Sequence, residues 1–179
     1  MEKGLKELKS NVCNILLTDI QKENTLPLGF TIFLERFANK YNLGIEQLPT
    51  KSHAYNVYGD KNSFRLWGDM VYFIKWLETK GLILYYEQIN GQFSNDLQKI
   101  GNCDSTEPMI LDGDIKNYIK QHLPHYIWIS PELESYVNHN FMTDELYEAK
   151  RQTCYARWTL FLAIATFVAQ IVFSKICGC

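Results

Sequence analysis

The residues with the clearest potential for metal chemistry are His122 and His125, which form a His-x-x-His pair. A zinc site uses four ligands in tetrahedral geometry, and Cys103 and His139 are the further ligands that the chain could supply. The pair flanks Leu123-Pro124 instead of lying on one face of a regular helix, and the sequence has neither a Cys-x-x-Cys nor a His-Glu-x-x-His motif. We therefore expect core or solvent-exposed histidines and no metal site.

Signatures of catalysis are also sparse. Cys13 and Cys103 have no histidine nearby in the sequence, and Cys13 falls on or beside the apolar face of a predicted helix, where cysteine is structural. Asp112 and Asp114 do not fit the spacing of a calcium loop, and the start of a helix explains both carboxylates. The sequence thus predicts a protein that is not an enzyme and that uses no cofactor.

Charge divides the 179-residue chain into two unequal parts. All 20 acidic residues lie at or before Glu148, so residues 1–149 carry 14 − 20 = −6 and residues 150–179 carry +4. The overall charge of −2 argues against a protein that holds nucleic acid by phosphate neutralisation alone. Five scattered cysteines are too few for a secreted disulfide scaffold of this size, and 46% hydrophobic residues predict a packed core.

The basic C-terminal part predicts a membrane-spanning helix. Residues 158–173 contain no charge, proline or glycine, and the residues that follow extend the segment to about 20, the length that a hydrocarbon core requires. We assign residues 158–176 to a transmembrane helix and residues 143–157 to a basic juxtamembrane helix. The alternative is a buried C-terminal helix of a soluble core, which would carry polar residues every three or four positions.

The residues that flank this segment predict its orientation. Tyr155 and Trp158 lie where aromatic side chains meet a membrane surface, Arg157 precedes the apolar segment and Lys175 follows it. The positive-inside rule then predicts a single-pass membrane protein with its N-terminus in the cytoplasm. Because the polar N-terminal residues do not form a signal peptide, we expect tail anchoring. The terminal Cys-Gly-Cys resembles a prenylated tail, but unpaired thiols or acylation sites explain it better.

One side of the predicted span carries small and polar residues. Thr159, Ala163, Thr166 and Gln170 fall near one face of a helix. In lipid, small residues allow close approach of two backbones, and polar ones form hydrogen bonds between helices. We therefore expect the protein to form a homo-oligomer through this face.

The preceding residues, 1–142, predict a mainly α cytoplasmic domain with a small β-hairpin. Apolar residues recur at helical spacing over residues 3–23, from Phe30 to Tyr41, and from Ser63, which we expect to cap the third helix. The polar stretches 45–63 and 96–112 predict long connections. Further helices are expected over residues 114–122 and from the starts at Ser130 and Thr143.

A helix followed by a hairpin gives this domain its most specific pattern. Gly81 is expected to end the third helix, Leu82–Glu87 has the composition of a strand, and Asn90-Gly91 favours a tight turn. The run WLETKGLILYYEQINGQF, after three helices, resembles the winged-helix superfamily over about residues 28–95. The connection between the second and third helices is longer than is typical of that family. The resemblance implies that the third helix contacts DNA or a protein.

The charge of the third helix favours a protein partner. Arg65 and Lys75 are balanced by Asp69 and Glu78, so the helix lacks the basic stripe that phosphate contacts require. We do not expect nucleic-acid binding, and we expect contact with a cytoplasmic protein of unknown identity. The candidate contact residues are Arg65, Lys75, Tyr85 and Tyr86.

Two functional hypotheses follow. The first is a membrane-anchored, non-enzymatic interaction or effector protein, whose layout resembles that of oligomerising, membrane-perturbing accessory proteins of bacterial anti-phage defence. The alternative is a membrane-tethered winged-helix transcription regulator.

Overall fold

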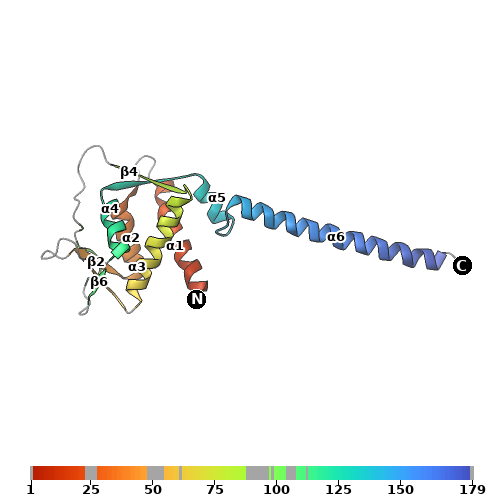
Figure 1. Ribbon diagram of the computed structural model, residues 1–179, viewed down its shortest axis with the longest axis horizontal. Helices are drawn as coiled ribbons and strands as arrows, with labels where there is room; N and C mark the ends of the chain where they lie inside the picture. The colour runs from red at the N-terminus through yellow and green to blue at the C-terminus, as the bar shows by residue number, and fades with distance from the viewer. Residues whose placement is uncertain are drawn as a thin grey trace. The chain divides into compact units, whose positions relative to one another are not determined.

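The computed structural model describes residues 2–22, 28–47, 55–60, 62–87, 97, 99–103, 108–111 and 113–177. These residues form a mostly helical structure with short antiparallel strands (Figure 1). The helices are α1 (Glu2–Lys22), α2 (Phe30–Tyr41), α3 (Ser63–Thr79), α4 (Gly113–His122), α5 (Glu132–Asn138) and α6 (Asp144–Cys177). The strands are β1 (Leu28–Gly29), β2 (Gly44–Gln47), β3 (Tyr55–Tyr58), β4 (Ile83–Glu87), β5 (Ile100–Gly101), β6 (Met109–Leu111) and β7 (His125–Ile129).

The chain divides into two compact units, Met1–Glu134 and Ser135–Cys179. We refer to them as the N-terminal unit and the C-terminal unit. The N-terminal unit contains α1 to α4 and all the strands named above, and the C-terminal unit contains most of α5 and the whole of α6. Each unit is described separately.

The first three helices build the core of the N-terminal unit. Their apolar stripes face inward, as the helical spacing predicts, and α1 packs against both α2 and α3. Aromatic rings fill the space between them. The ring centroids of Phe37 in α2 and Trp67 in α3 are 5.4 Å apart, and both side chains are fully buried. The predictions of helices over residues 3–23, 30–41, from 63 and over 114–122 are therefore confirmed.

The two ends of α3 differ in how well they were predicted. Gly81 adopts a φ of 70°, its N–H donates to the Glu78 carbonyl, and the Leu82 N–H donates to the Leu77 carbonyl, so the predicted glycine stop is confirmed. Ser63 does not cap the helix, because its hydroxyl donates to the Asp60 carboxylate over 3.1 Å. That carboxylate also accepts the backbone N–H of Asn62, the residue that precedes the helix.

The strands form two antiparallel sheets in the N-terminal unit. One has the order β1-β7-β4, and the other has the order β5-β2-β3-β6. The strand expected over Leu82–Glu87 is present as β4, but its described partner is β7, and the Asn90-Gly91 turn lies outside the described residues. The prediction of connections over 45–63 and 96–112 was wrong for part of each stretch, since they contribute β2, β3, β5 and β6.

The helices near the C-terminus begin where their capping residues predict. The Ser130 hydroxyl accepts the N–H of Glu132 at the start of α5, and the Thr143 hydroxyl accepts the N–H of Leu146 at the start of α6. Helix α6 continues for 34 residues because no proline or glycine interrupts it. At about 1.5 Å per residue its length is about 50 Å.

Candidate membrane anchor and the polar junction before it

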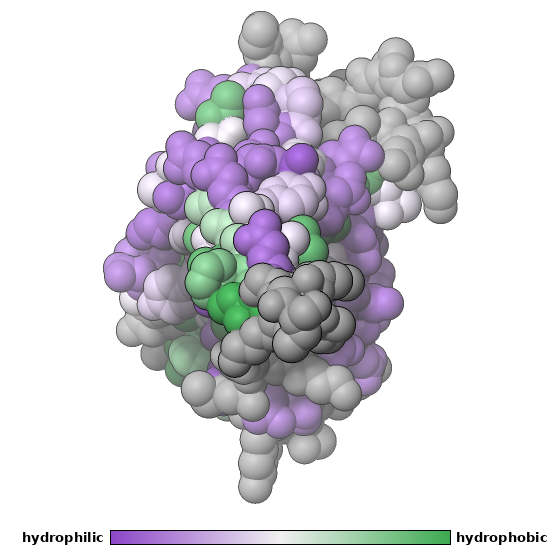
Figure 2. Space-filling model, turned by 90° about the vertical axis from the view of Figure 1, so that its right-hand side faces the viewer, coloured by the Kyte–Doolittle hydropathy of each residue, from purple (hydrophilic) through white to green (hydrophobic). Residues whose placement is uncertain are grey.

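The outstanding feature of the C-terminal unit is the exposed apolar surface of α6. Trp158, Phe161 and Leu162 are each about 61% exposed, and Figure 2, which looks toward the C-terminal end of α6, shows hydrophobic residues gathered on this helix. In the described part of the chain, α6 alone is long and apolar enough to cross a membrane, and none of its apolar stretch is buried. A buried helix of a soluble core, the alternative prediction, does not fit a surface of this kind.

The small and polar residues predicted to mediate self-association lie along one side of α6. The Thr159 hydroxyl donates to the Tyr155 carbonyl, and the Thr166 hydroxyl donates to the Leu162 carbonyl over 2.7 Å. Both hydroxyls are therefore satisfied within the helix and do not carry an unpaired donor into lipid. The spacing of three and four residues also continues toward the N-terminus of the helix. The complete stripe is Ala149, Gln152, Ala156, Thr159, Ala163, Thr166 and Gln170.

A different side of α6 carries basic and aromatic residues. Tyr147, Lys150, Arg151, Cys154 and Tyr155 line a concavity of about 480 Å³ together with Met142. At about 100° per residue, this face is centred roughly 140° around the helix from the small-residue stripe.

Three of the four residues predicted to mark the membrane boundary lie where the apolar stretch of α6 begins. The exposed ring of Trp158 contacts Phe161 edge to face, with ring centroids 6.0 Å apart, and Tyr155 and Arg157 are also exposed. Lys175 belongs to the last turn of α6, and its side chain lies outside the described residues. The aromatic and basic residues therefore meet at the start of the apolar stretch.

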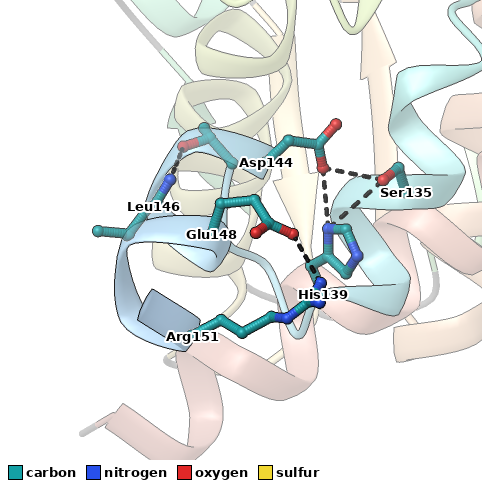
Figure 3. Close-up of polar contacts among 7 residues, drawn as sticks. Ser135, His139, Asp144, Leu146, Glu148 and Arg151 are labelled. Atoms are coloured by element: carbon teal, nitrogen blue, oxygen red, sulfur yellow. Dashed lines mark hydrogen bonds and ion pairs between the residues drawn. The ribbon is translucent and has the colours of Figure 1, made fainter. Parts of the chain in front are cut away.

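A cluster of polar side chains joins the end of α5 to the start of α6 (Figure 3). The Asp144 carboxylate accepts hydrogen bonds from the Ser135 hydroxyl at 2.9 Å and from Nδ1 of His139 at 2.8 Å. The bond from Ser135, and then the bond from His139, hold the pKa of the Asp144 carboxyl below its ordinary value. The His139 ring also stacks in parallel on Tyr147, with centroids 3.8 Å apart. These contacts fix the first turn of α6 against the residues that precede it.

Ser135, His139 and Asp144 have the residue types of a catalytic triad but not its geometry. In a triad, one imidazole nitrogen binds the carboxylate and the other accepts the proton of the serine. Here Nδ1 of His139 binds the Asp144 carboxylate and also lies nearest to the Ser135 hydroxyl, 3.4 Å away. The serine donates its proton to Asp144 instead. The arrangement is that of a structural junction.

The candidate partner contacts of the N-terminal unit are not gathered at one place. Arg65 is exposed on α3 and pairs with Asp69, with Nε and Oδ2 3.5 Å apart, whereas Lys75 lies further along the same helix. Tyr86 is exposed on β4. The neighbouring Tyr85 points to the interior, where its ring stacks on His122 and its hydroxyl lies 3.1 Å from that of Tyr118.

The two histidines of the His-x-x-His pair lie beside this interior cluster. His122 is 5% exposed, and burial followed by the nearby His125 lowers the pKa of His122 to about 4. The Nδ1 atoms of both histidines are buried without a hydrogen-bond partner. Among the residues that the structure describes, no three His, Cys, Asp or Glu side chains are grouped closely enough to hold a metal ion. The rings of both histidines pack against Tyr85 and against each other.

The sequence analysis missed an exposed apolar group on the outer face of the first sheet. Leu84 of β4 lies opposite Trp128 of β7, Tyr86 lies opposite Tyr126, and three of these four side chains are more than 40% exposed. The alternation of side chains in HYIWI was the available signal, because alternate residues of a strand share a face.

Comparison with known proteins assigns no family to the chain. No protein-family model matches it, and no significant similarity to a curated protein or to a solved structure was found.

Proposed function

We propose that the chain is a membrane-anchored interaction or effector protein without enzymatic activity. In this proposal α6 crosses the bilayer once, and the N-terminal unit lies in the cytoplasm. The observation that carries it is the exposed apolar stretch of α6, none of which is buried and which a bilayer would cover. The basic residues before this stretch support the orientation.

Membrane insertion can be tested by alkaline extraction. The full chain should remain in the membrane pellet at high pH. Replacing Phe161 and Leu162 with lysine should release it, because each lysine in the apolar stretch opposes insertion by up to about 3 kcal/mol. Leu146→Lys is the control, since Leu146 is also exposed on α6 but precedes the apolar stretch. Release of the unaltered chain would contradict the proposal.

The orientation can be tested with the exposed thiol of Cys154. In a variant with Cys177 and Cys179 changed to serine, a membrane-impermeant maleimide should label the protein only after the cells are opened. Labelling of Cys154 in intact cells would place the N-terminal side outside.

We further propose that α6 self-associates along the small-residue stripe. Its alternation of three and four residues is the heptad period of left-handed helix pairs, and its Ala and Thr side chains permit close approach. In a chain with Cys154, Cys177 and Cys179 changed to serine, the single variants Ala149→Cys, Gln152→Cys and Ala156→Cys should form disulfide-linked dimers in membranes. Cysteines at 150, 151 and 155 should not, and Gln170→Leu should weaken the dimer. Equal crosslinking at all six positions would contradict this proposal.

An effector that perturbs the membrane is the more specific form of the proposal. Only its layout, an anchored soluble domain with an associating span, links it to accessory proteins of bacterial anti-phage defence. Induced expression should collapse the membrane potential, as measured with a voltage-sensitive dye. The Phe161→Lys, Leu162→Lys variant should leave the potential intact. An unchanged potential with the native chain would reject the effector role and leave an interaction role.

A membrane-tethered winged-helix regulator is the second candidate. The succession of α1, α2 and α3 and the sheet order β1-β7-β4 favour it. The chain departs from a simple winged helix by inserting β2 and β3 between α2 and α3, and β5, β6 and α4 between β4 and β7. Against DNA binding, α3 packs on α1, α4, β3 and β4, and Asp69 already pairs with Arg65. Gel shifts at low salt test it. Tight, salt-sensitive binding would make the regulator the favoured candidate. Absence of binding leaves the exposed Arg65, Lys75 and Tyr86 as candidates for contact with a protein.

A further inference from the structure

We propose that the concavity on the first turns of α6 binds the headgroup of an anionic phospholipid. Lys150 and Arg151 would contact the phosphate, and Tyr147 and Tyr155 would flank it. This inference rests on the proposed membrane anchor and extends it by naming a lipid class.

The composition of the concavity is the first observation. Six residues from one compact unit line about 480 Å³, and they combine two adjacent cations with two tyrosines and the apolar Met142. An anionic phospholipid offers the matching combination, because its phosphate is negatively charged and the acyl chains beside it are apolar. Tyrosine rings are favoured at this level of a membrane because they join an apolar ring to a polar hydroxyl.

The distribution of charge is the second observation. No acidic residue follows Glu148 in the sequence, so the concavity lies at the border between the acidic and the basic parts of the chain. Nη1 of Arg151 lies 3.1 Å from Glu148, and its guanidinium group lies over the Tyr155 ring. In the described part of the chain, no ion pair involves Lys150. Lys150 is therefore available to a phosphate, and Glu148 competes with that phosphate for Arg151.

The position along α6 agrees with the headgroup layer. Lys150 and Arg151 precede Trp158 by two helical turns, which is about 10 to 12 Å along the axis. The polar layer on each side of the hydrocarbon core is about 5 to 8 Å thick, so the backbone of these two residues lies roughly 2 to 7 Å beyond it, within the reach of their long side chains to phosphate groups.

The two faces of α6 are compatible in one assembly. The small-residue stripe and the basic-aromatic face are separated by roughly 140° around the helix axis. Pairing of two helices through the stripe therefore leaves the concavity of each helix facing lipid.

The test compares two lipids around Trp158, which lies on the same side of α6 as the concavity. The full chain is reconstituted in phosphatidylcholine vesicles that contain an equal fraction of brominated phosphatidylglycerol or brominated phosphatidylcholine. Bromine quenches tryptophan fluorescence on contact. The other three tryptophans belong to the N-terminal unit, which lies outside the bilayer in this proposal, so the quenched part of the fluorescence comes from Trp158 and the ratio of quenching reports lipid selectivity. We expect brominated phosphatidylglycerol to quench more strongly, and Lys150→Gln and Arg151→Gln each to lower the selectivity by up to about fivefold.

Two acidic variants provide a matched control. Glu148→Gln should raise the selectivity, because it releases Arg151. Glu145→Gln makes the same charge change on the other side of the helix and should leave the selectivity unchanged. Neutralising Lys75 and Lys120 of the N-terminal unit should also have no effect, since their exposed side chains lie outside the concavity.

Failure of the proposed lipid site and failure of the proposed membrane anchor would give different results. Equal quenching by the two brominated lipids, in a chain that resists alkaline extraction, overturns the lipid site and leaves the anchor. Absence of quenching of Trp158 by either lipid contradicts the anchor. Loss of the selectivity on addition of millimolar inorganic phosphate, at constant ionic strength, would show a general anion site and would also overturn the lipid assignment.

Discussion

At the scale of single residues, His122 is a titratable side chain that the interior of the N-terminal unit keeps in its neutral form. Its ring is stacked on Tyr85 with centroids 3.9 Å apart and lies 4.4 Å from the ring of Tyr118. Tyr118 donates to the Glu78 carboxylate, so the polar atoms of the cluster are bonded to one another and not to the imidazole. The cluster accepts His122 as a neutral aromatic ring, which explains its lowered pKa.

The pKa of His122 predicts a loss of stability in mild acid. In the unfolded chain His122 binds a proton near pH 6.5, and in the folded chain only near pH 4. The free energy of unfolding therefore falls, by up to about 3 kcal/mol, as the pH is lowered from 6.5 to 4. His122→Phe keeps an aromatic ring of similar size and should remove most of this pH dependence. Urea unfolding of the detergent-solubilised chain from pH 4 to 7 measures it. An unchanged profile in the variant would contradict the assignment.

Asp144 gives a prediction of the same kind at the junction. Because its native pKa is lowered, its bonds to Ser135 and His139 stabilise the junction at neutral pH, and this contribution is lost as the pH falls through the native pKa. Ser135→Ala removes the larger cause and should raise the pKa of Asp144 toward its ordinary value. Carboxyl NMR titration measures the shift. A fall in this pKa would show that the serine bond is not its main cause.

At the scale of elements, two glycines distinguish conformational strain from steric conflict. Gly81 and Gly101 have nearly the same φ, 70° and 72°. A Cβ at Gly81 would meet no atom within 4 Å, whereas a Cβ at Gly101 would collide with the Leu43 carbonyl oxygen.

The matched substitutions should therefore differ in cost. Gly81→Ala should lower the free energy of unfolding by about 1 to 2 kcal/mol, the cost of the left-handed conformation. Gly101→Ala adds overpacking and should cost about 2 to 5 kcal/mol in total. Chemical denaturation of both variants measures the difference. Equal losses would mean that the backbone at Gly101 moves to relieve the collision.

The helices could be predicted from the sequence because their patterns are long. In α1 and α2, apolar residues repeat over at least three turns, and Gly81, Ser130 and Thr143 mark helix ends with local chemistry. The strands β2, β3, β5, β6 and β7 were missed for the opposite reason. Of these, β2, β3, β5 and β6 have two to four residues, which is too short for a periodic signal, and β5 and β6 pair with strands from a distant part of the chain. The alternation in β7 was readable, but its partner strands β1 and β4 are also distant in the sequence.

The candidate site could likewise be predicted from the sequence only in part. The apolar stretch of α6 and its boundary residues could be predicted, because hydrophobicity over a long segment needs no knowledge of tertiary contacts. The bonds among Ser135, His139 and Asp144 could not, since they depend on the turn that places the three side chains together. The concavity around Lys150 could not be predicted either, because it is lined in part by Met142, whose position follows from that turn.

At the scale of the whole molecule, the division into two units predicts that the N-terminal unit does not need the anchor in order to fold. Its core is built from α1, α2 and α3, and its sheets pair strands of the same unit. A chain that ends at residue 157 should be soluble and should unfold within about 3 °C of the full chain, since a larger shift would indicate a loss of about 1 kcal/mol. Circular dichroism melting in the same detergent compares the two. Unfolding of the shorter chain at room temperature would refute this independence.

The alignment of the small-residue stripe around the helix axis depends on the unbroken course of α6. Because α6 has no proline or glycine hinge, each residue inserted before the apolar stretch would rotate the rest of the helix about its axis by about 100°. One alanine inserted after Ala156 would set the two halves of the small-residue stripe on different sides, whereas seven inserted residues would return them to nearly the same side. Dimer yield should therefore rise and fall with the number of residues inserted, and helical phase, more than the length of the helix, would govern how copies of this protein meet.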